Sequence, residues 1–281
     1  MDIDKFCANP PEDYFDDLKE KEQQALVALS VYAIENGQGN TLMASRILAL
    51  SHSIEIYVGG FRRGRKQPER ENAIRMNVTS GSAMKVNGEK LTQLSPLYIG
   101  PVRGNGEVAN TFENLWQYSK VYPQLGHWDY EKEEPTEKWW KWMHKGFNTL
   151  KNGKGVRTPP EISVLKKKVR EGKIDSWTPI GSWWEGKLLG YIEARKVIYA
   201  PNYQELIREV PVLVEMRQKL ENILILDLDG PSQDEYPEGA LATEDFIWDK
   251  LNDPSAPFGH GYVVAAELSG IDMKKLAESR R

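Results

Sequence analysis

The chain has 281 residues, of which 40% are hydrophobic and 28% are charged, and its formal net charge is −4. It is long enough for one sizeable domain or two small ones. Because no window approaches 18 uninterrupted apolar residues, a membrane-spanning helix is excluded. The lone Cys7 excludes an internal disulfide, and the acidic N-terminus does not resemble a secretory signal. We therefore expect a cytoplasmic protein that needs no metal and no cofactor.

The first ninety residues predict a helical extension. Apolar positions recur at spacings of three and four over 20–35 and again over 42–58, which predicts an antiparallel helical hairpin. A basic loop follows at 61–75, with six basic residues against two acidic ones. Asn87-Gly88 then predicts a β-hairpin over 84–91. We place a boundary after residue 92, with this extension before it and a larger unit over 93–281.

The larger unit predicts an α+β fold that is mainly helical with a small sheet. We expect a strand over 95–102, a helix over 110–122 that Pro123 closes, and a tryptophan-rich helix over 135–145. Eight of the nine tryptophans lie between Trp116 and Trp184, so residues 123–187 form a distinct insert.

The last hundred residues predict helices around one strand. A helical region over 188–222 is expected to break at Pro201 and Pro211. The apolar run ILILDL over 223–228 predicts a buried strand, and helices are expected over 243–251 and 260–268.

One face of the helix over 110–122 carries polar chemistry. Positions 113, 116, 117 and 120 fall on the same side of a helix, where they present a carboxylate, an indole, an amide and an ammonium. A ring beside an acid and a cation suits a ligand with a base and a sugar or phosphate. The structural alternative is a capping box with Asn110 as N-cap, which leaves Trp116 in the core and Lys120 at its rim.

Three further groups are candidates for the same site. Asp227 and Asp229 are two residues apart at the strand end, where paired carboxylates divide acid and base roles or hold Mg²⁺; the alternative is a solvated turn. Glycines flank His260 at a helix start, where backbone N–H groups can meet an anion, or where glycine simply marks the helix entry. Arg195 either contacts phosphate or pairs with a neighbouring glutamate.

Basic runs at 61–75 and 151–173 have two interpretations. They hold phosphates or nucleic acid, or they are solvated loops on an otherwise acidic protein.

The run from Glu113 to Lys120, ENLWQYSK, resembles the E-x-x-[YF]-[FY]-Q-A-x-K-F helix of the NADAR family. The segments IYAPNYQEL and LENILILDLD are similar to that family's later helix and following strand, although Pro201-Asn202 stands where the family has lysine. The segment FGHG at 258–261 is similar to its closing W-G-x-G region. The resemblance covers about residues 95–268, and it implies a NADAR-like α+β core.

That family includes N-glycosidases of riboflavin-pathway intermediates and enzymes that remove ADP-ribose from nucleobases. The resemblance therefore implies an N-glycosidase that acts on an ADP-ribosylated or phosphoribosyl substrate. Glu113, Lys120 and Asp229 would then be catalytic. The residues that would bind substrate are Trp116, Gln117, Arg195, Asp227 and His260.

Two other classes remain open at this point. A non-enzymatic interaction protein could retain an enzyme-like core, as a phage-encoded inhibitor of a host defence complex would. Its insert and helical hairpin would then bind a partner protein, or a second copy of the chain in a homo-oligomer. The two basic runs favour a nucleic-acid binder, whereas the net negative charge of the chain opposes it. None of the three involves a membrane.

Overall fold

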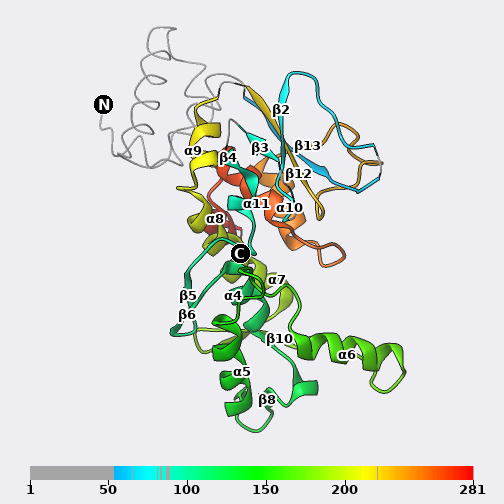
Figure 1. The fold of residues 1–281 in the computed structure, drawn as a ribbon, viewed down its shortest axis with the longest axis vertical. Coiled ribbons are helices and arrows are strands. Elements are labelled where there is room, and N and C mark those ends of the chain that lie inside the picture. The colour runs from blue at the N-terminus through cyan, green and yellow to red at the C-terminus, as the bar shows by residue number, and fades with distance from the viewer. Residues whose placement is uncertain are drawn as a thin grey trace.

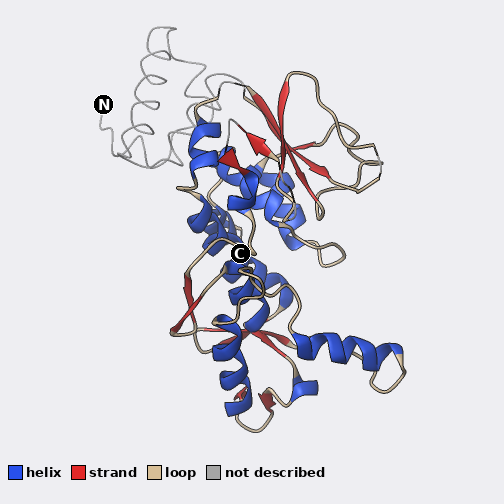
Figure 2. Ribbon diagram, viewed as in Figure 1, coloured by secondary structure: helices blue, strands red, loops and turns tan. Residues whose placement is uncertain are grey.

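The computed structural model describes residues 54–64, 66–80, 82, 84–86, 89–219 and 221–280. Over these residues the chain has an α+β fold, as predicted (Figure 2). The helix predicted over 20–35, and the hairpin built on it, lie outside the described residues. Within the described part of the chain, no helix combines the length and the apolar character needed to cross a bilayer.

A four-stranded sheet forms one end of the molecule (Figure 1). Its strands, in spatial order, are β13 (Ala240–Leu241), β1 (Ile56–Gly60), β12 (Asn222–Asp227) and β2 (Ala73–Asn77). β12 runs parallel to both β1 and β2, with Ile223 opposite Ile56 and Ile74, whereas β13 is antiparallel to β1. Strands from both sides of residue 92 therefore share one sheet, and the boundary predicted there does not separate them.

The helix predicted over 42–58 is wrong at its C-terminal end, because residues 56–58 belong to strand β1. All five residues of β1 are buried. A short strand that is buried on both faces has no alternation along the sequence, so periodicity cannot distinguish it from a helix end.

The predicted central strand and closing helix are both confirmed. β12 is buried from Ile223 to Asp227, and α11 (His260–Leu268), which is buried throughout, contacts both β1 and β12. Gly261 allows this close approach, since a Cβ there would lie 2.6 Å from the Cβ of Asp227. Helix α11 thus begins directly against the end of β12.

The insert forms much of the opposite end (Figure 1). There β7 (Lys120–Val121), β10 (Gly181–Trp184) and β11 (Lys187–Leu189) make a second sheet. Helix α5 (Glu137–Phe147) lies nearby, and α6 (Pro160–Arg170) extends away from the body. The tryptophan-rich helix predicted over 135–145 is α5.

Small hairpins complete the strands. They are β3 (Lys85–Val86) with β4 (Glu89–Lys90), β5 (Val102–Gly104) with β6 (Glu107–Ala109), and β8 (Trp128–Asp129) with β9 (Glu134–Pro135). The first is the predicted hairpin. The strand predicted over 95–102 is wrong for most of its length, because residues 95–99 fold into a turn in which Ile99 N–H donates to the Ser95 carbonyl.

One long helical segment passes between the two ends of the molecule. It consists of α7 (Tyr191–Ala194), the π-helical η3 (Arg195–Tyr199) and α8 (Ala200–Ile207), without interruption. The break expected at Pro201 does not occur. Pro201 has no N–H for the Val197 carbonyl, and the Asn202 side chain donates to that carbonyl at 3.3 Å and to the Ile198 carbonyl at 2.7 Å. Pro201 therefore widens one turn instead of ending the helix.

The remaining helical elements are η1 (Leu91–Leu94), α4 (Phe112–Tyr118), η2 (Pro123–Leu125), α9 (Pro211–Arg217), α10 (Glu244–Asn252) and α12 (Met273–Ser279). Pro211 does separate α8 from α9, as expected. Helix α10 matches the prediction over 243–251, with Thr243 as its N-cap.

Candidate functional site

A cavity of about 330 Å³ lies where the end of β12, the start of α11, helix α4 and the α7–η3 segment meet. Seven of the eight predicted site residues line it: Glu113, Trp116, Gln117, Arg195, Asp227, Asp229 and His260. Sequence reasoning did not identify the other residues of its wall: Ser80, Pro96, Arg157, Tyr191, Tyr199, Leu228, Pro257 and Phe258. Its volume is in the range of small-ligand sites, about 300–1,000 Å³.

Helix α4 places Glu113 in the cavity wall. The N-cap lies one residue later than predicted, because the hydroxyl of Thr111, and not the side-chain amide of Asn110, accepts the N–H of Asn114 at 3.2 Å. Glu113 Oε1 accepts a hydrogen bond of 2.9 Å from Gln117 Nε2. Burial raises the pKa of Glu113, and the neighbouring Gln117 and Lys120 partly oppose that increase.

Lys120 lies behind this carboxylate and does not line the cavity. Helix α4 ends at Tyr118, so Lys120 belongs to β7 and not to the predicted helical face. Its Nζ donates to Gln117 Oε1 at 2.8 Å, which makes Gln117 a bridge between Lys120 and Glu113. Burial lowers the pKa of Lys120 to about 8, although the charge of Glu113 raises it. Lys120 therefore acts on the cavity through Gln117.

The Trp116 ring is held in the wall by its neighbours. It lies edge-on to the Tyr199 ring at a centroid distance of 5.0 Å, and Lys120 Nζ lies 4.9 Å from its centroid. The side chain is partly buried and also lines the cavity. Trp116 thus packs against the core and presents an edge or face to a ligand at the same time.

Asp227 is buried and its carboxylate is fully engaged. Oδ1 accepts the N–H of Leu228 at 2.8 Å, and Oδ2 accepts the N–H of Gly261 at 2.9 Å. His260 Nδ1 lies 3.4 Å from Oδ2, while its Nε2 is 2.6 Å from the carbonyl oxygen of Val78. The anion that the FGHG segment was predicted to receive at the helix start is the carboxylate of Asp227 itself.

Asp229 follows in the turn after β12, and its side chain lines the cavity. Burial of its carboxyl group in the cavity wall and the charge of Asp227 raise the pKa of Asp229, while His260, Arg157 and Arg62 oppose that increase. The two predicted aspartates therefore have different surroundings. Asp227 fixes the start of α11, and Asp229 faces the cavity.

Arg195 is buried and engaged with the chain before α11. Its guanidinium donates to the carbonyls of Asp253 at 2.7 Å and Ala256 at 2.5 Å, and to the Tyr191 hydroxyl at 2.6 Å. The predicted pairing with Glu193 or Glu185 is not among the ion pairs of the described residues. Arg195 thus shapes one wall of the cavity by positioning residues 253–256.

Arg157 is the exposed cation of this cavity, and it comes from the second basic run. Gly155 N–H donates to the Leu97 carbonyl at 2.7 Å, and Val156 N–H donates to Asn114 Oδ1 at 2.7 Å. These bonds attach the loop to the turn over 95–99 and to α4, and they bring Arg157 to the cavity. The described residues include no ion pair to Arg157, so its guanidinium is available to an anion.

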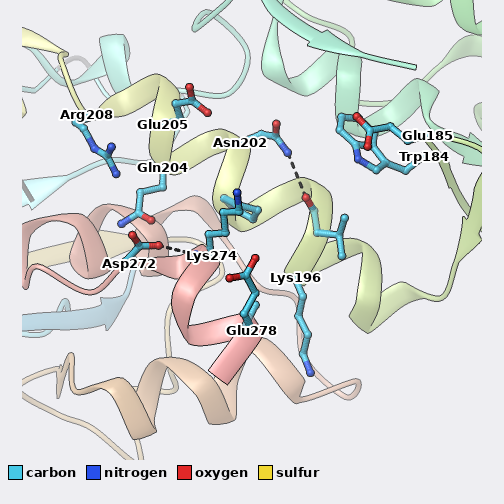
Figure 3. Close-up of a pocket in the computed structure, with 13 residues that line it drawn as sticks. Trp184, Glu185, Lys196, Asn202, Gln204, Glu205, Arg208, Asp272, Lys274 and Glu278 are labelled. Carbon is cyan, nitrogen blue, oxygen red and sulfur yellow. Dashed lines mark hydrogen bonds between the residues drawn. The ribbon is translucent and has the colours of Figure 1, made fainter. Parts of the chain in front are cut away.

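A second cavity, of about 390 Å³, lies among the end of β10 with the turn after it, η3, α8 and α12 (Figure 3). Its charged lining comes from Glu185, Lys196, Glu205, Arg208, Asp272, Lys274 and Glu278. Several of its polar groups hold helices in place: Asn202 covers two carbonyls, and Asp272 caps α12 by accepting from Lys274 N–H and Lys275 N–H at 3.0 Å. No predicted site residue lines it.

The part of the chain that the structure describes contains no group of three or more His, Cys, Asp or Glu side chains arranged to hold a metal ion. The chain matches no protein-family model, and no curated protein or solved structure is similar to it.

Proposed function

We propose that this protein cleaves the N-glycosidic bond of a phosphoribosyl or ADP-ribosyl substrate in the cavity at the end of β12. The observation that carries the proposal is the composition of the cavity wall. Two carboxylates with raised pKa values, Glu113 and Asp229, share it with the exposed cation Arg157 and the aromatic side chains Trp116 and Tyr199. Carboxylates, an anion-binding group and aromatic rings suit the sugar cation, the phosphate and the base of an N-glycosyl phosphate.

The chemistry assigns different tasks to these groups. As the C1′–N bond breaks, its electron pair leaves with the base and positive charge grows on the sugar, as in glycoside hydrolysis. The ionised carboxylate of Glu113 stabilises that charge, because it lies in a site from which much of the water is excluded. Water then attacks C1′ and transfers a proton to Asp229. Arg157 holds the phosphate, and Gln117, oriented by Lys120, fixes the Glu113 carboxylate.

The test is an assay of base release. The intact protein is incubated with nucleoside 5′-monophosphates, with NAD⁺ and with ADP-ribosylated nucleobases, and free base is separated by chromatography. We expect release by the wild type from at least one substrate and almost none by Glu113→Gln. The matched control is Glu205→Gln, which changes a glutamate of the second cavity. Equal rates for the wild type and Glu113→Gln would refute the proposal.

Exposed apolar side chains favour a second candidate, a protein that binds a partner through its insert. Six of the large hydrophobic side chains exposed in the described residues lie in the insert over 123–187: Tyr130, Trp140, Leu150, Val164, Trp177 and Ile180. A second copy of the chain is the simplest partner. Light scattering over a range of concentrations should then show association that a Tyr130→Ser/Trp140→Ser variant loses. A monomer at every concentration would refute this candidate.

A further inference from the structure

Tyr199 is an aromatic residue of the cavity wall to which no role was assigned from the sequence. Its side chain is 7% exposed and lines the cavity. Four rings hold it in place: those of Phe112 at 5.2 Å, Trp116 at 5.0 Å, Tyr203 at 6.2 Å and Phe258 at 6.3 Å between centroids. A ring packed on several sides keeps a fixed orientation, so its hydroxyl group is preorganised.

The π-helical turn explains why Tyr199 is in this position. The N–H of Ala200 bonds to the Arg195 carbonyl, five residues back, because Pro201 cannot continue the usual ladder. This wide turn contains both Arg195 and Tyr199, and both side chains line the cavity. Single π-helical turns within α-helices occur frequently at functional sites.

The Tyr199 hydroxyl differs from the two other tyrosine hydroxyls of this segment. Tyr203 donates to the Leu94 carbonyl, and the Tyr191 hydroxyl accepts from Arg195 at 2.6 Å. The hydroxyl of Tyr199 makes no hydrogen bond to any residue that the structure describes. The hydroxyl oxygen is not among the fully buried atoms that lack a partner, and Tyr199 lines the cavity. A ligand bound in the cavity can therefore accept a hydrogen bond from it.

The charges around Tyr199 indicate which part of a ligand it meets. Burial, followed by the charges of Glu113, Asp227 and Asp229, raises the pKa of Tyr199 well above its usual value. The phenol therefore keeps its proton and acts as a hydrogen-bond donor. The same carboxylates repel a phosphate from this part of the cavity, whereas the adjacent Trp116 ring suits a base.

We propose that Tyr199 is a further catalytic residue. Its hydroxyl group donates a hydrogen bond to the departing base as negative charge grows on the base. This inference rests on the proposed N-glycosidase function. No proton is transferred from Tyr199, and the bond strengthens only as the C1′–N electron pair moves onto the base.

The test compares Tyr199→Phe with Tyr203→Phe. Each change removes one hydroxyl group and keeps a buried ring, but Tyr203 does not line the cavity. Hydrolysis of inosine 5′-monophosphate is measured beside that of 7-methylguanosine 5′-monophosphate, whose base leaves as a neutral molecule. We expect Tyr199→Phe to lower kcat about 10- to 100-fold on the first substrate and less than about threefold on the second. Tyr203→Phe should change kcat by the same factor on the two substrates.

Calorimetric titration of inosine 5′-monophosphate separates this inference from the proposed function. If the wild type binds without hydrolysis and Tyr199→Phe binds at least threefold more weakly, the function fails while the ligand contact of Tyr199 stands. If the wild type hydrolyses the substrate and Tyr199→Phe is unchanged, the function stands and the role of Tyr199 is overturned. If the wild type neither binds nor hydrolyses any substrate of the base-release assay, these two nucleotides included, both are overturned.

Discussion

The two cavities of this protein are similar in size and differ in what their polar groups do. The second cavity, at about 390 Å³, is slightly larger than the one at the end of β12, at about 330 Å³. Its Gln204 bonds to the Ile271 carbonyl and the Met273 N–H, and its Asp272 caps α12. In the smaller cavity Arg157 and the Tyr199 hydroxyl have no hydrogen-bond or ion-pair partner in the described chain. The smaller cavity also has four aromatic side chains in its wall, those of Trp116, Tyr191, Tyr199 and Phe258, whereas the larger one has Trp184 alone. Aromatic rings beside carboxylates, rather than volume, distinguish the candidate site.

The largest expected effect comes from the carboxylate of Glu113. Glu113→Gln keeps the shape of the side chain and removes the charge that stabilises the sugar cation, so we expect base release to fall about 10³-fold, or about 4 kcal/mol of transition-state stabilisation. The comparison is with Glu205→Gln in the second cavity, measured by the same chromatographic assay. A comparable loss in Glu205→Gln would remove the distinction between the two cavities.

The contact between α11 and β12 should carry the next largest effect, on stability. Gly261→Ala places a methyl group 2.6 Å from the Cβ of Asp227, so we expect the free energy of unfolding to fall by about 1–3 kcal/mol. Urea denaturation followed by circular dichroism measures this. Gly190→Ala is the matched control, because a Cβ there meets no atom within 4 Å. If Gly261→Ala and Gly190→Ala had the same free energy of unfolding, the contact between α11 and β12 would not require a glycine at position 261.

Arg157 should contribute to binding more than to the chemical step. Arg157→Ala removes the exposed cation of the smaller cavity, and we expect KM for a phosphorylated substrate to rise about tenfold with little change in kcat, a loss of about 1.4 kcal/mol from a charge-assisted contact. Lys274→Ala, in the second cavity, should leave KM unchanged. An unchanged KM in Arg157→Ala would place the phosphate elsewhere.

The smallest expected effect is a shift of the pH profile. Activity should rise through an acid limb above the usual carboxyl range, because Glu113 must ionise and its pKa is raised, and it should fall near pH 8 as Lys120 loses its proton. The positive charge of Lys120 lowers the pKa of Glu113. Lys120→Met should therefore move the acid limb of kcat/KM to higher pH by up to about one unit and abolish the limb near pH 8. If the acid limb did not move, the charge of Lys120 would have no influence on the ionisation of Glu113.

Local patterns predicted the elements that build the candidate site. The apolar run of β12, the glycines before α11 and the polar face of α4 are each visible within a dozen residues. Together with the family resemblance, they predicted Glu113, Asp229 and His260 as site residues, and all three line one cavity.

The residues that the sequence did not reveal depend on contacts between distant segments. Arg157 reaches the cavity only because Asn114, 42 positions before Val156, anchors its loop. Tyr199 faces the cavity because Asn202 stabilises a turn that Pro201 widens, whereas proline alone predicts a break. β1 is a strand because β12 and β13 flank it, and its sequence has no alternation to show this.

The most direct test of the account is a calorimetric titration of ADP-ribose into the intact wild type, Glu113→Gln and Glu205→Gln. We predict one binding site per chain, an affinity that changes at least threefold in Glu113→Gln, and no change in Glu205→Gln. Binding that is weakened by Glu205→Gln and unaffected by Glu113→Gln, or the absence of binding to all three proteins, would contradict the assignment of the site to the cavity at the end of β12.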